Sequence, residues 1–432
     1  MRRSATGWAV GLLIAGSMLE ARAADLPTFR AQTIDPEIGK VCYAVATTDV
    51  DGDGRPDVVA VANDAVVWYQ NPTWQKRDIV RNATEPDNVC LQPHDVDGDG
   101  RVDFALGSAW RPTDTKAGGN LAIVTRTGAP EGTWRLVPIG SEPTLHRVRW
   151  GHVLAQGTQL VAAPLQGRDT RGPDWGAGAG SRIIAWSIPA RPFDEPWTPT
   201  TIGESLHAVH NIAILEQPQP YLPRGRGDGP APLSSSPLLA ASWEGVFLYQ
   251  RRDDATWAVD QLGSGDQATR PNRGTSEVRP GRLRDGSAFL AAIEPWHGSK
   301  FVAYSHPEPP DGRTPAMVRQ VVDESLAWGH AVACVDLDGD GDDEVLIGQR
   351  DPNPRAEPGR RGPGIILYDP KPRKGEGSDP ITFDRRWVDE GGVAVEDLVA
   401  ADLNGDGRPE IIAGGRATHN VRIYWNEGTP RL

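Results

Sequence analysis

The chain of 432 residues is poor in cysteine, methionine and lysine, and it has no excess of positive charge. Its 45 lysine and arginine residues are outnumbered by 58 aspartate and glutamate residues, for a net charge of −13. A phosphate backbone would be repelled by this balance, so the composition argues against a nucleic-acid-binding protein. A mean hydropathy of −0.45 with 38% hydrophobic residues excludes a polytopic membrane protein.

Motifs of several enzyme classes are also missing. The sequence has no Gly-x-Ser-x-Gly elbow of an α/β-hydrolase and no phosphate-binding P-loop. Its scarcity of lysine disfavours the phosphate-binding face of a β-propeller phytase. Three cysteines cannot all pair, and Cys42, Cys90 and Cys334 stand in apolar, strand-like contexts. This favours buried free thiols and leaves a Cys42–Cys90 disulfide open.

The first 23 residues have the features of a secretory signal peptide. A basic segment at Arg2 and Arg3 precedes an apolar stretch over residues 8–19, and residues 21–23 supply a small-residue cleavage site. The apolar stretch is too short to span a bilayer, and no cysteine follows it to carry a lipid. We therefore expect an exported chain that begins near Ala24, lies in the periplasm or outside the cell, and has no membrane span.

A bulky residue followed five positions later by an aliphatic residue recurs along the whole chain. The pairs are Phe29/Ile34, Trp74/Ile79, Trp134/Ile139, Trp197/Ile202, Trp257/Leu262, Met317/Val322 and Phe383/Val388. Three further strand-like runs separate successive pairs, and radial repetition of four-stranded units makes a β-propeller. The last unit lacks its outer strand while the chain begins with a spare one. We therefore predict an all-β fold: one seven-bladed propeller over residues 24–432, closed by the N-terminal strand.

Four of these units carry a nine-residue acidic loop between their first and second strands. Oxygen ligands at positions one, three, five and nine suit Ca²⁺, and glycine at position six permits a sharp turn. We expect structural calcium here, although Asp-Gly turns that merely end strands would give the same pattern. The loops resemble those of the FG-GAP or VCBS repeat family, whose propellers bind calcium. The expected ligands are Asp49, Asp51, Asp53, Asp57, Asp95, Asp97, Asp99, Asp103, Asp336, Asp338, Asp340, Glu344, Asp402, Asn404, Asp406 and Glu410.

A second group of residues falls at matched positions on the opposite face of the disc. Seven or eight residues after most outer-strand aliphatics, the chain enters an inner strand whose side chains can point into the central channel. Imidazole suits a transition metal such as Zn²⁺ or Mn²⁺ better than Ca²⁺, so we expect one such ion there. Histidines that only hydrogen-bond around a water-filled channel are the alternative. The expected ligands are His146, His210, His330, Glu277 and Glu396, and the same count reaches Cys42 in the first unit.

Turns after the second strand of each unit place tryptophan beside charged residues on the histidine face. A flat apolar ring next to directional hydrogen-bonding groups is typical of a carbohydrate pocket, although loop residues are often polar without binding anything. The expected substrate-binding residues are Trp243, Trp296, Arg168, Arg350, Arg416 and His419.

The seven units, the histidines at the blade entries and the segment from Glu294 to Gly298 together resemble a narrower family. This is the propeller domain of aldos-2-ulose dehydratase, also described as 1,5-anhydro-D-fructose dehydratase. The resemblance implies the metal-assisted dehydration of a keto-sugar by β-elimination. The sequence lacks that family's C-terminal cupin-like module, so the second, isomerising activity is not expected.

The expected function is therefore an exported, metal-dependent carbohydrate lyase acting on a keto-sugar or glycoside. His297 is the candidate acid or base, with Glu244 or Glu277 as its partner. The rival hypothesis is a noncatalytic, calcium-stabilised propeller for sugar binding or adhesion. Convergence of His146, His210 and His330 within metal-bonding distance would distinguish the enzyme from the binding module.

Overall fold

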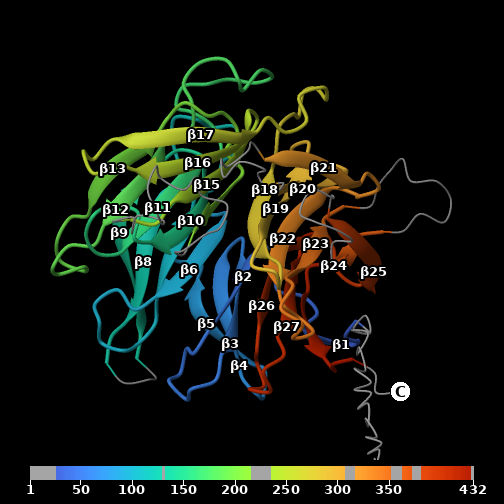
Figure 1. Ribbon diagram of the computed structural model, residues 1–432. Coiled ribbons are helices and arrows are strands. Elements are labelled where there is room, and N and C mark those ends of the chain that lie inside the picture. The colour runs from blue at the N-terminus through green and yellow to red at the C-terminus, as the bar shows by residue number, and fades with distance from the viewer. Residues whose placement is uncertain are drawn as a thin grey trace, which may run out of the picture.

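The structure is a computed structural model that describes residues 26–128, 132–215, 235–306, 317–351, 362–371 and 381–429. The predicted signal peptide lies outside these residues. The described chain forms 28 strands in seven four-stranded antiparallel sheets, arranged as blades around a central axis (Figure 1). Within it, no helix is long and apolar enough to cross a membrane. The predicted all-β, seven-bladed propeller is confirmed.

The strands fall into four sets by their distance from the axis. The inner strands are β2 (Cys42–Thr48), β6 (Cys90–His94), β10 (Leu145–Gly151), β14 (Asn211–Ile214), β18 (Glu277–Arg282), β22 (Gly329–Val335) and β26 (Val395–Ala401). The second strands are β3 (Asp57–Ala62), β7 (Asp103–Ser108), β11 (Gln159–Pro164), β15 (Leu238–Ser242), β19 (Ala288–Glu294), β23 (Glu344–Gln349) and β27 (Glu410–Gly415).

The two remaining sets form the outer half of each blade. The third strands are β4 (Ala65–Gln70), β8 (Asn120–Arg126), β12 (Ile183–Ser187), β16 (Gly245–Arg251), β20 (Lys300–Ser305), β24 (Gly364–Lys371) and β28 (Val421–Asn426). The outer strands are β5 (Gln75–Arg81), β9 (Trp134–Ser141), β13 (Thr198–Gly203), β17 (Trp257–Gly263), β21 (Val318–Asp323), β25 (Thr382–Glu390) and, from the N-terminus, β1 (Phe29–Asp35).

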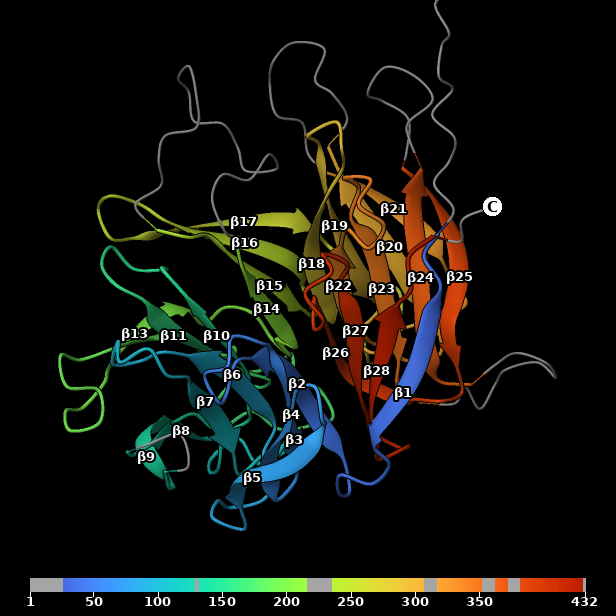
Figure 2. The same cartoon turned by 90° about the horizontal axis from the view of Figure 1, so that it is seen from below.

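The ring closes where the two ends of the chain meet. Strand β1 pairs antiparallel with β28, so that Phe29 lies opposite Asn426 and Thr33 opposite Arg422 (Figure 2). Along the axis each inner strand contacts the next, and β26 contacts β2. The predicted closure by the N-terminal strand is confirmed.

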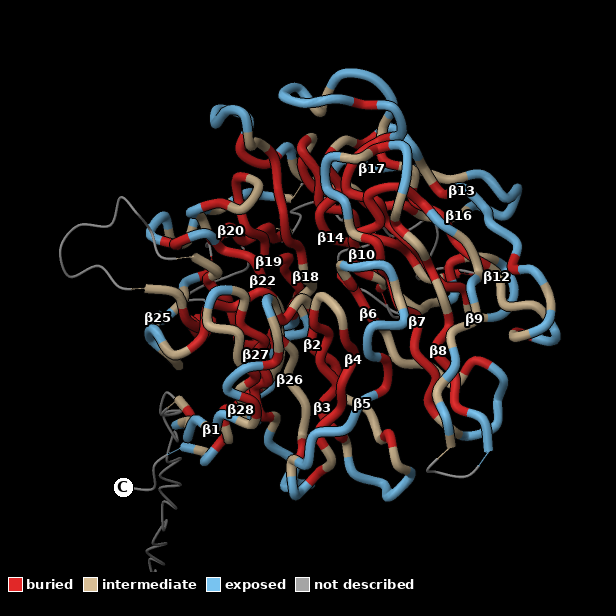
Figure 3. Tube along the Cα trace, turned by 180° about the vertical axis from the view of Figure 1, so that it is seen from behind, coloured by how far each residue is buried: buried red, intermediate tan, exposed pale blue. Residues whose placement is uncertain are grey.

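Burial follows directly from this stacking of blades. The second strands are buried along their whole length, as in β3 and β7, because each blade packs on a neighbour at both faces (Figure 3). The outer strands alternate or are largely exposed. All three cysteines are free thiols, and Cys42 and Cys90 are buried, so the disulfide left open by the sequence does not form.

An aromatic residue on the third strand of a blade reaches the outer strand of the preceding blade. Where that strand offers an aspartate, the phenol donates a hydrogen bond to it: Tyr69 to Asp35 and Tyr368 to Asp323, each at 2.6 Å. Both carboxylates stand directly after the repeated aliphatic residue of the sequence pattern. The pattern therefore marks an inter-blade contact as well as an outer strand.

Where the outer strand offers glycine, the aromatic ring itself fills the space. A Cβ on Gly140 would lie 2.3 Å from the Trp186 ring, and one on Gly203 would lie 2.6 Å from the Tyr249 ring. Contacts this short force the ring or the strand to move. Glycine at this position is thus needed for close approach of the blades.

We expect Gly140→Ala to destabilise the propeller by roughly 1–3 kcal/mol, the usual cost of overpacking a core. Gly362→Ala is the matched control, because a Cβ at Gly362 meets nothing within 4 Å. Thermal unfolding of the two variants should show a lower midpoint for Gly140→Ala alone. Equal midpoints would contradict the inter-blade packing described here.

Candidate functional site

The entries to four inner strands are distorted in the same way. The pairing register skips one residue at Tyr43, His146, His330 and Glu396. A β-bulge of this kind leaves its extra residue unpaired and re-aims the side chain. All four side chains line one cavity of about 170 Å³ at this end of the channel. The first unit therefore contributes Tyr43, and not Cys42 as the count along the sequence predicted.

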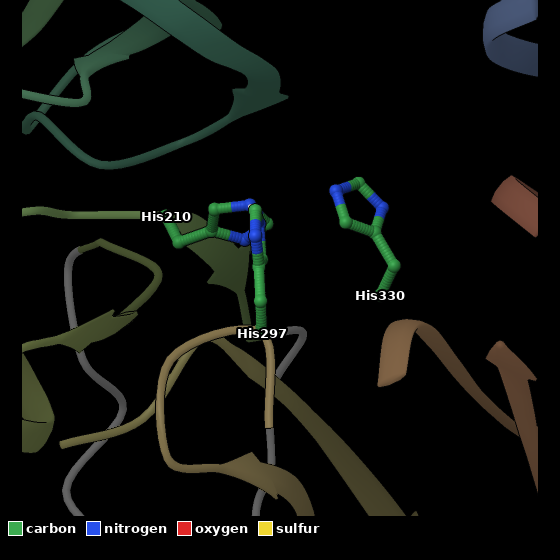
Figure 4. A group of neighbouring side chains, drawn as sticks. All are labelled: His210, His297 and His330. Carbon is green, nitrogen blue, oxygen red and sulfur yellow. The ribbon is translucent and has the colours of Figure 1, made fainter. Parts of the chain in front are cut away.

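Three histidines converge in this cavity from different blades. His210 directly precedes β14, His330 is the bulged residue of β22, and His297 lies in the turn after β19. One ring nitrogen from each lies within 4.8 Å of the others. The Nε2 atoms of His210 and His297 are 2.7 Å apart, while His330 faces them from the other side (Figure 4).

Hydrogen bonds on the far side of two rings determine which nitrogen is free. His210 Nδ1 lies 2.8 Å from a Glu277 carboxylate oxygen, and His330 Nδ1 lies 2.6 Å from the backbone oxygen of Glu396. A carbonyl oxygen can only accept, so His330 Nδ1 carries a proton. The Glu277 carboxylate also accepts a hydrogen bond from Asn211, and in this ionised form it places a proton on His210 Nδ1. Burial lowers the pKa of both imidazoles well below the usual range, so both are neutral and each Nε2 keeps its lone pair.

This donor set fits a transition metal. Metal-bound histidine commonly donates its second ring nitrogen to a carboxylate or a backbone carbonyl, which is the arrangement at His210 and His330. Burial lowers the pKa of His297 as well, so the third imidazole is also neutral. Two ring nitrogens at 2.7 Å must share either a proton or a cation between them. Three neutral imidazoles are the ligand type that Zn²⁺ and similar ions prefer.

A carboxylate completes the cavity beside the histidines. Glu396 Oε1 accepts a hydrogen bond of 2.8 Å from Arg416 and lies 3.9 Å from His330 Nε2. Its Oε2 is buried and has no hydrogen-bond partner within the described residues. Burial raises the pKa of this carboxyl, while Arg416 and Arg350 oppose the shift. Oε2 lies 4.0 Å from Arg350 Nε, beyond hydrogen-bond distance, so its lone pairs remain available to a ligand or to a proton.

The structure changes the roles predicted for three residues. His146 does not join the metal-binding group, because its Nδ1 bonds the His210 carbonyl oxygen at 2.9 Å and its Nε2 faces Arg147 at 2.9 Å. His297, predicted as the acid or base, takes its place in the group. Glu277, predicted as both ligand and catalyst, lies behind His210 and orients it.

One predicted catalytic residue, Glu244, and several predicted substrate-binding residues lie away from the cavity. Glu244 is held by His207, whose Nδ1 is 2.9 Å from its carboxylate. Arg168 pairs with Glu142 at 2.8 Å. Trp243 is only 4% exposed and its ring lies under a guanidinium. The remaining member of this set, His419, also does not line the cavity.

Arg350, Arg416 and Trp296 do line the cavity, as the sequence predicted. Trp296, however, stacks on His297 with ring centroids 3.9 Å apart, so the ring that was expected to face a sugar instead supports a histidine. Trp328, which sequence reasoning missed, is 38% exposed, and its ring centroid lies 6.5 Å from that of His297. The sequence signal for Trp328 was its position two residues before His330.

The acidic loops lie where the sequence placed them, between the first and second strands of four blades. Ligand atoms converge in three of them, within the groups Asp49/Asp51/Asp53, Asp95/Asp97/Asp99 and Asp336/Asp338/Glu344. The loop from Asp402 to Glu410, in which Asn404 replaces one acid, forms no such group of three acidic residues within the described chain.

Carboxyls in the loop between β22 and β23 have strongly raised pKa values. Glu344 is fully buried, and its Oε1 has no hydrogen-bond partner in the described chain. Burial raises the pKa of Glu344 to about 9 and that of Asp338 to about 6, which means that these carboxyls lack a compensating charge.

The fifth-position carboxylates also form ion pairs, including Asp53 and Asp99, which belong to the converging groups. Asp53 pairs with Arg55 at 2.6 Å, and the equivalent acids of the other three loops also bind a guanidinium. In the third loop this cation is Arg284, which reaches across from the neighbouring blade to Asp340. In the other loops the arginine stands two residues after the fifth-position acid, and this spacing was the sequence signal for the ion pair.

Comparisons with known proteins give two family matches. Residues 118–307 match the family described as "Aldos-2-ulose dehydratase, beta-propeller domain", and residues 49–106 match the FG-GAP-like repeat. Aldos-2-ulose dehydratase of Phanerodontia chrysosporium is 27% identical over 253 residues, which are 55% of this chain and 26% of that protein. The aligned part is thus about a quarter of that relative's length.

Two solved structures align over most of the chain at low identity. One is an Agrocybe aegerita lectin that recognises non-reducing terminal N-acetylglucosamine (TM-score 0.45, 11% identity, 79% of this chain and 80% of that chain). The other is BBS1N in complex with ARL6DN (TM-score 0.49, 12% identity, 95% and 98%). Neither likeness bears on function. The two family matches confirm the resemblance, predicted from the sequence, to the aldos-2-ulose dehydratase propeller and to FG-GAP-like repeats.

Proposed function

We propose that this protein is an exported, metal-dependent carbohydrate lyase that removes water from a keto-sugar by β-elimination. The observation that carries the proposal is the convergence of three neutral imidazoles beside a buried carboxylate in one cavity. The match to the aldos-2-ulose dehydratase propeller supports a carbohydrate substrate and a dehydration. Because the match spans only part of that relative, the activity is our proposal for this chain.

His210, His297 and His330 would hold the metal ion through their ring nitrogens. When bound, a divalent ion supplies Lewis-acid stabilisation of the enolate that forms when a proton leaves the carbon next to a carbonyl. Glu277 and the Glu396 carbonyl oxygen keep two of these rings in the required tautomer.

Glu396 is the group best placed to move the proton. In β-elimination a C–H bond and the C–O bond on the neighbouring carbon break, a C=C bond forms, and the hydroxyl leaves as water. The buried Oε2 of Glu396 can accept the proton from carbon, and its raised pKa strengthens it as a base. Glu396 then returns this proton to the departing hydroxyl, which leaves as water. Tyr43, whose pKa is raised to about 12 by burial, stays protonated and can donate a hydrogen bond to the departing hydroxyl.

Binding of the sugar ring would involve groups at the rim of the same cavity. Arg350 and Arg416 both line it and present hydrogen-bond donors to hydroxyl groups. The exposed ring of Trp328 lies beside Arg350 and offers an apolar platform. These contacts orient the keto-sugar against Glu396 while the histidines stay in place.

We expect two variants to separate metal binding from proton transfer. His330→Ala should lose both the bound metal and turnover. Glu396→Gln should keep the metal, because the backbone oxygen that orients His330 is unchanged, yet lose turnover by roughly 10²–10⁴-fold. Metal content by elemental analysis and loss of one water from aldos-2-uloses and 1,5-anhydro-D-fructose by mass spectrometry are the measurements.

Glu204→Gln, at an exposed carboxylate on the link before β14, is the matched control and should behave as the parent protein. Full turnover by Glu396→Gln would show that Glu396 is not the base of the reaction. A parent protein that holds metal and binds these sugars without converting them would instead favour the noncatalytic sugar-binding propeller.

We also propose that the acidic loops bind Ca²⁺ for stability. Support comes from Glu344, whose buried Oε1 lacks a partner beside Asp336 and Asp338. A cation there would compensate the buried charge, and carboxylate oxygens are the ligands that Ca²⁺ prefers. The loops lie at the ends of the inner strands opposite to the histidine cavity, so this calcium would take no part in the chemistry.

Stabilisation by calcium should grow as the pH rises from about 5 to about 7. Burial raises the pKa of Asp57 and of Asp103 to about 6, above the unfolded value of about 3.9. Without calcium, the folded chain therefore binds the extra protons, and stability falls as the pH rises through this window. Calcium binds the ionised carboxylates, so it stabilises the fold most at pH values above this window.

Thermal midpoints in EDTA and in excess calcium at both pH values test this expectation. Each occupied site should contribute about 2.7 kcal/mol when free calcium is 100 times its Kd. Glu344→Gln should reduce the calcium effect, whereas Asp253→Asn at an exposed turn should not. Midpoints indifferent to EDTA would overturn the calcium proposal.

A further inference from the structure

A second cavity lies in the axial channel next to the histidine cavity. It has a volume of about 430 Å³ and is lined by residues of inner strands, among them Arg147 and Arg149 of β10 and Arg279 of β18. Residues two apart on a strand point to the same side, which brings the first two guanidinium groups into the channel together. The two cavities share Tyr43 and Val89 as lining residues.

None of the three arginines forms an ion pair within the described part of the chain. Their hydrogen bonds go to neutral partners: Arg279 to the Val278 carbonyl oxygen at 2.8 Å, and Arg149 to the Val148 carbonyl oxygen at 2.8 Å. Arg147 donates to neutral His146 at 2.9 Å. Many other arginines of the described structure form ion pairs with carboxylates, whereas these three do not.

Among the described residues, Asp397 is the one carboxylate in the lining, and its charge offsets only one of the three arginines. Asp397 Oδ2 accepts a hydrogen bond of 3.1 Å from the Val45 backbone N–H. The lining thus keeps an excess of two positive charges inside a protein whose net charge is −13. Burial, and to a lesser degree the charges of Arg279 and Arg147, lower the pKa of Arg149 to about 9, while Asp397 and Glu277 oppose the shift.

We propose that this cavity is a binding site for one small oxyanion, held by Arg147, Arg149 and Arg279 within the channel. Guanidinium groups pair with carboxylate, sulfate and phosphate oxygens through two parallel hydrogen bonds, which is the strongest recognition available to them. A bound oxyanion would compensate the positive charge that remains beyond what Asp397 and Glu277 offset. The site is separate from the proposed metal ligands and does not rest on the proposed lyase activity.

The oxyanion could be an inorganic ion or the carboxylate of a sugar acid, and these share the same chemistry. Inorganic phosphate, sulfate and D-gluconate are therefore tested separately on the full-length protein, by calorimetry and by thermal unfolding, against chloride at equal ionic strength. We expect saturable binding of one oxyanion per chain and a raised thermal midpoint. Preference for gluconate over both inorganic ions would identify the carboxylate source.

Arg279→Met should weaken this binding about 10- to 100-fold, the worth of a charge-assisted hydrogen bond. Arg282→Met is the matched control on the same strand, because its side chain is 76% exposed, and it should bind as the parent protein does. Arg149→Met should abolish the anion-dependent rise in the thermal midpoint. The proposal is overturned if no oxyanion exceeds chloride, or if Arg282→Met weakens binding as much as Arg279→Met.

Discussion

One extra residue at the entry to an inner strand is the constraint on which the site depends. In a regular antiparallel ladder, successive side chains alternate between the two faces of a blade, where they pack against neighbouring blades. The bulges at Tyr43, His146, His330 and Glu396 break that alternation and turn one side chain toward the axis. Because the bulge recurs at the same place in different blades, side chains far apart in sequence meet in one cavity.

Neighbouring blades are linked at this level by one repeated hydrogen bond. In three blades, the histidine at the entry to the inner strand donates a hydrogen bond from its Nδ1–H to the corresponding residue of the next blade. The pairs are His146 to His210, His210 to Glu277, and His330 to Glu396. The acceptor is a backbone oxygen in two cases and a carboxylate in one. These bonds decide the tautomer of every ring, so the free nitrogen of His210 and of His330 faces the cavity, while that of His146 is taken by Arg147.

Charge is separated along the axis of the disc. The acidic loops gather carboxylates at one end of the inner strands, and the neutral histidines lie at the other. Between these ends, Arg147, Arg149 and Arg279 concentrate positive charge in a protein that is acidic overall. Burial sets the pKa directions of the buried groups: the pKa of Glu344 is raised, and those of the imidazoles and of Arg149 are lowered.

The sequence by itself determined the number of blades, their closure by the first strand and the positions of the acidic loops, because these depend on local patterns that repeat at a regular spacing. It also identified His210, His297 and His330 as residues of one site. The tertiary structure alone decided their roles. A bulge shifts the channel-facing position by one residue, from Cys42 to Tyr43, and no composition or spacing reveals that shift. Hydrogen bonds between blades likewise removed His146 from the ligand group and set Glu277 behind His210, because a ring nitrogen's availability depends on neighbours that the chain brings together only when the blades stack.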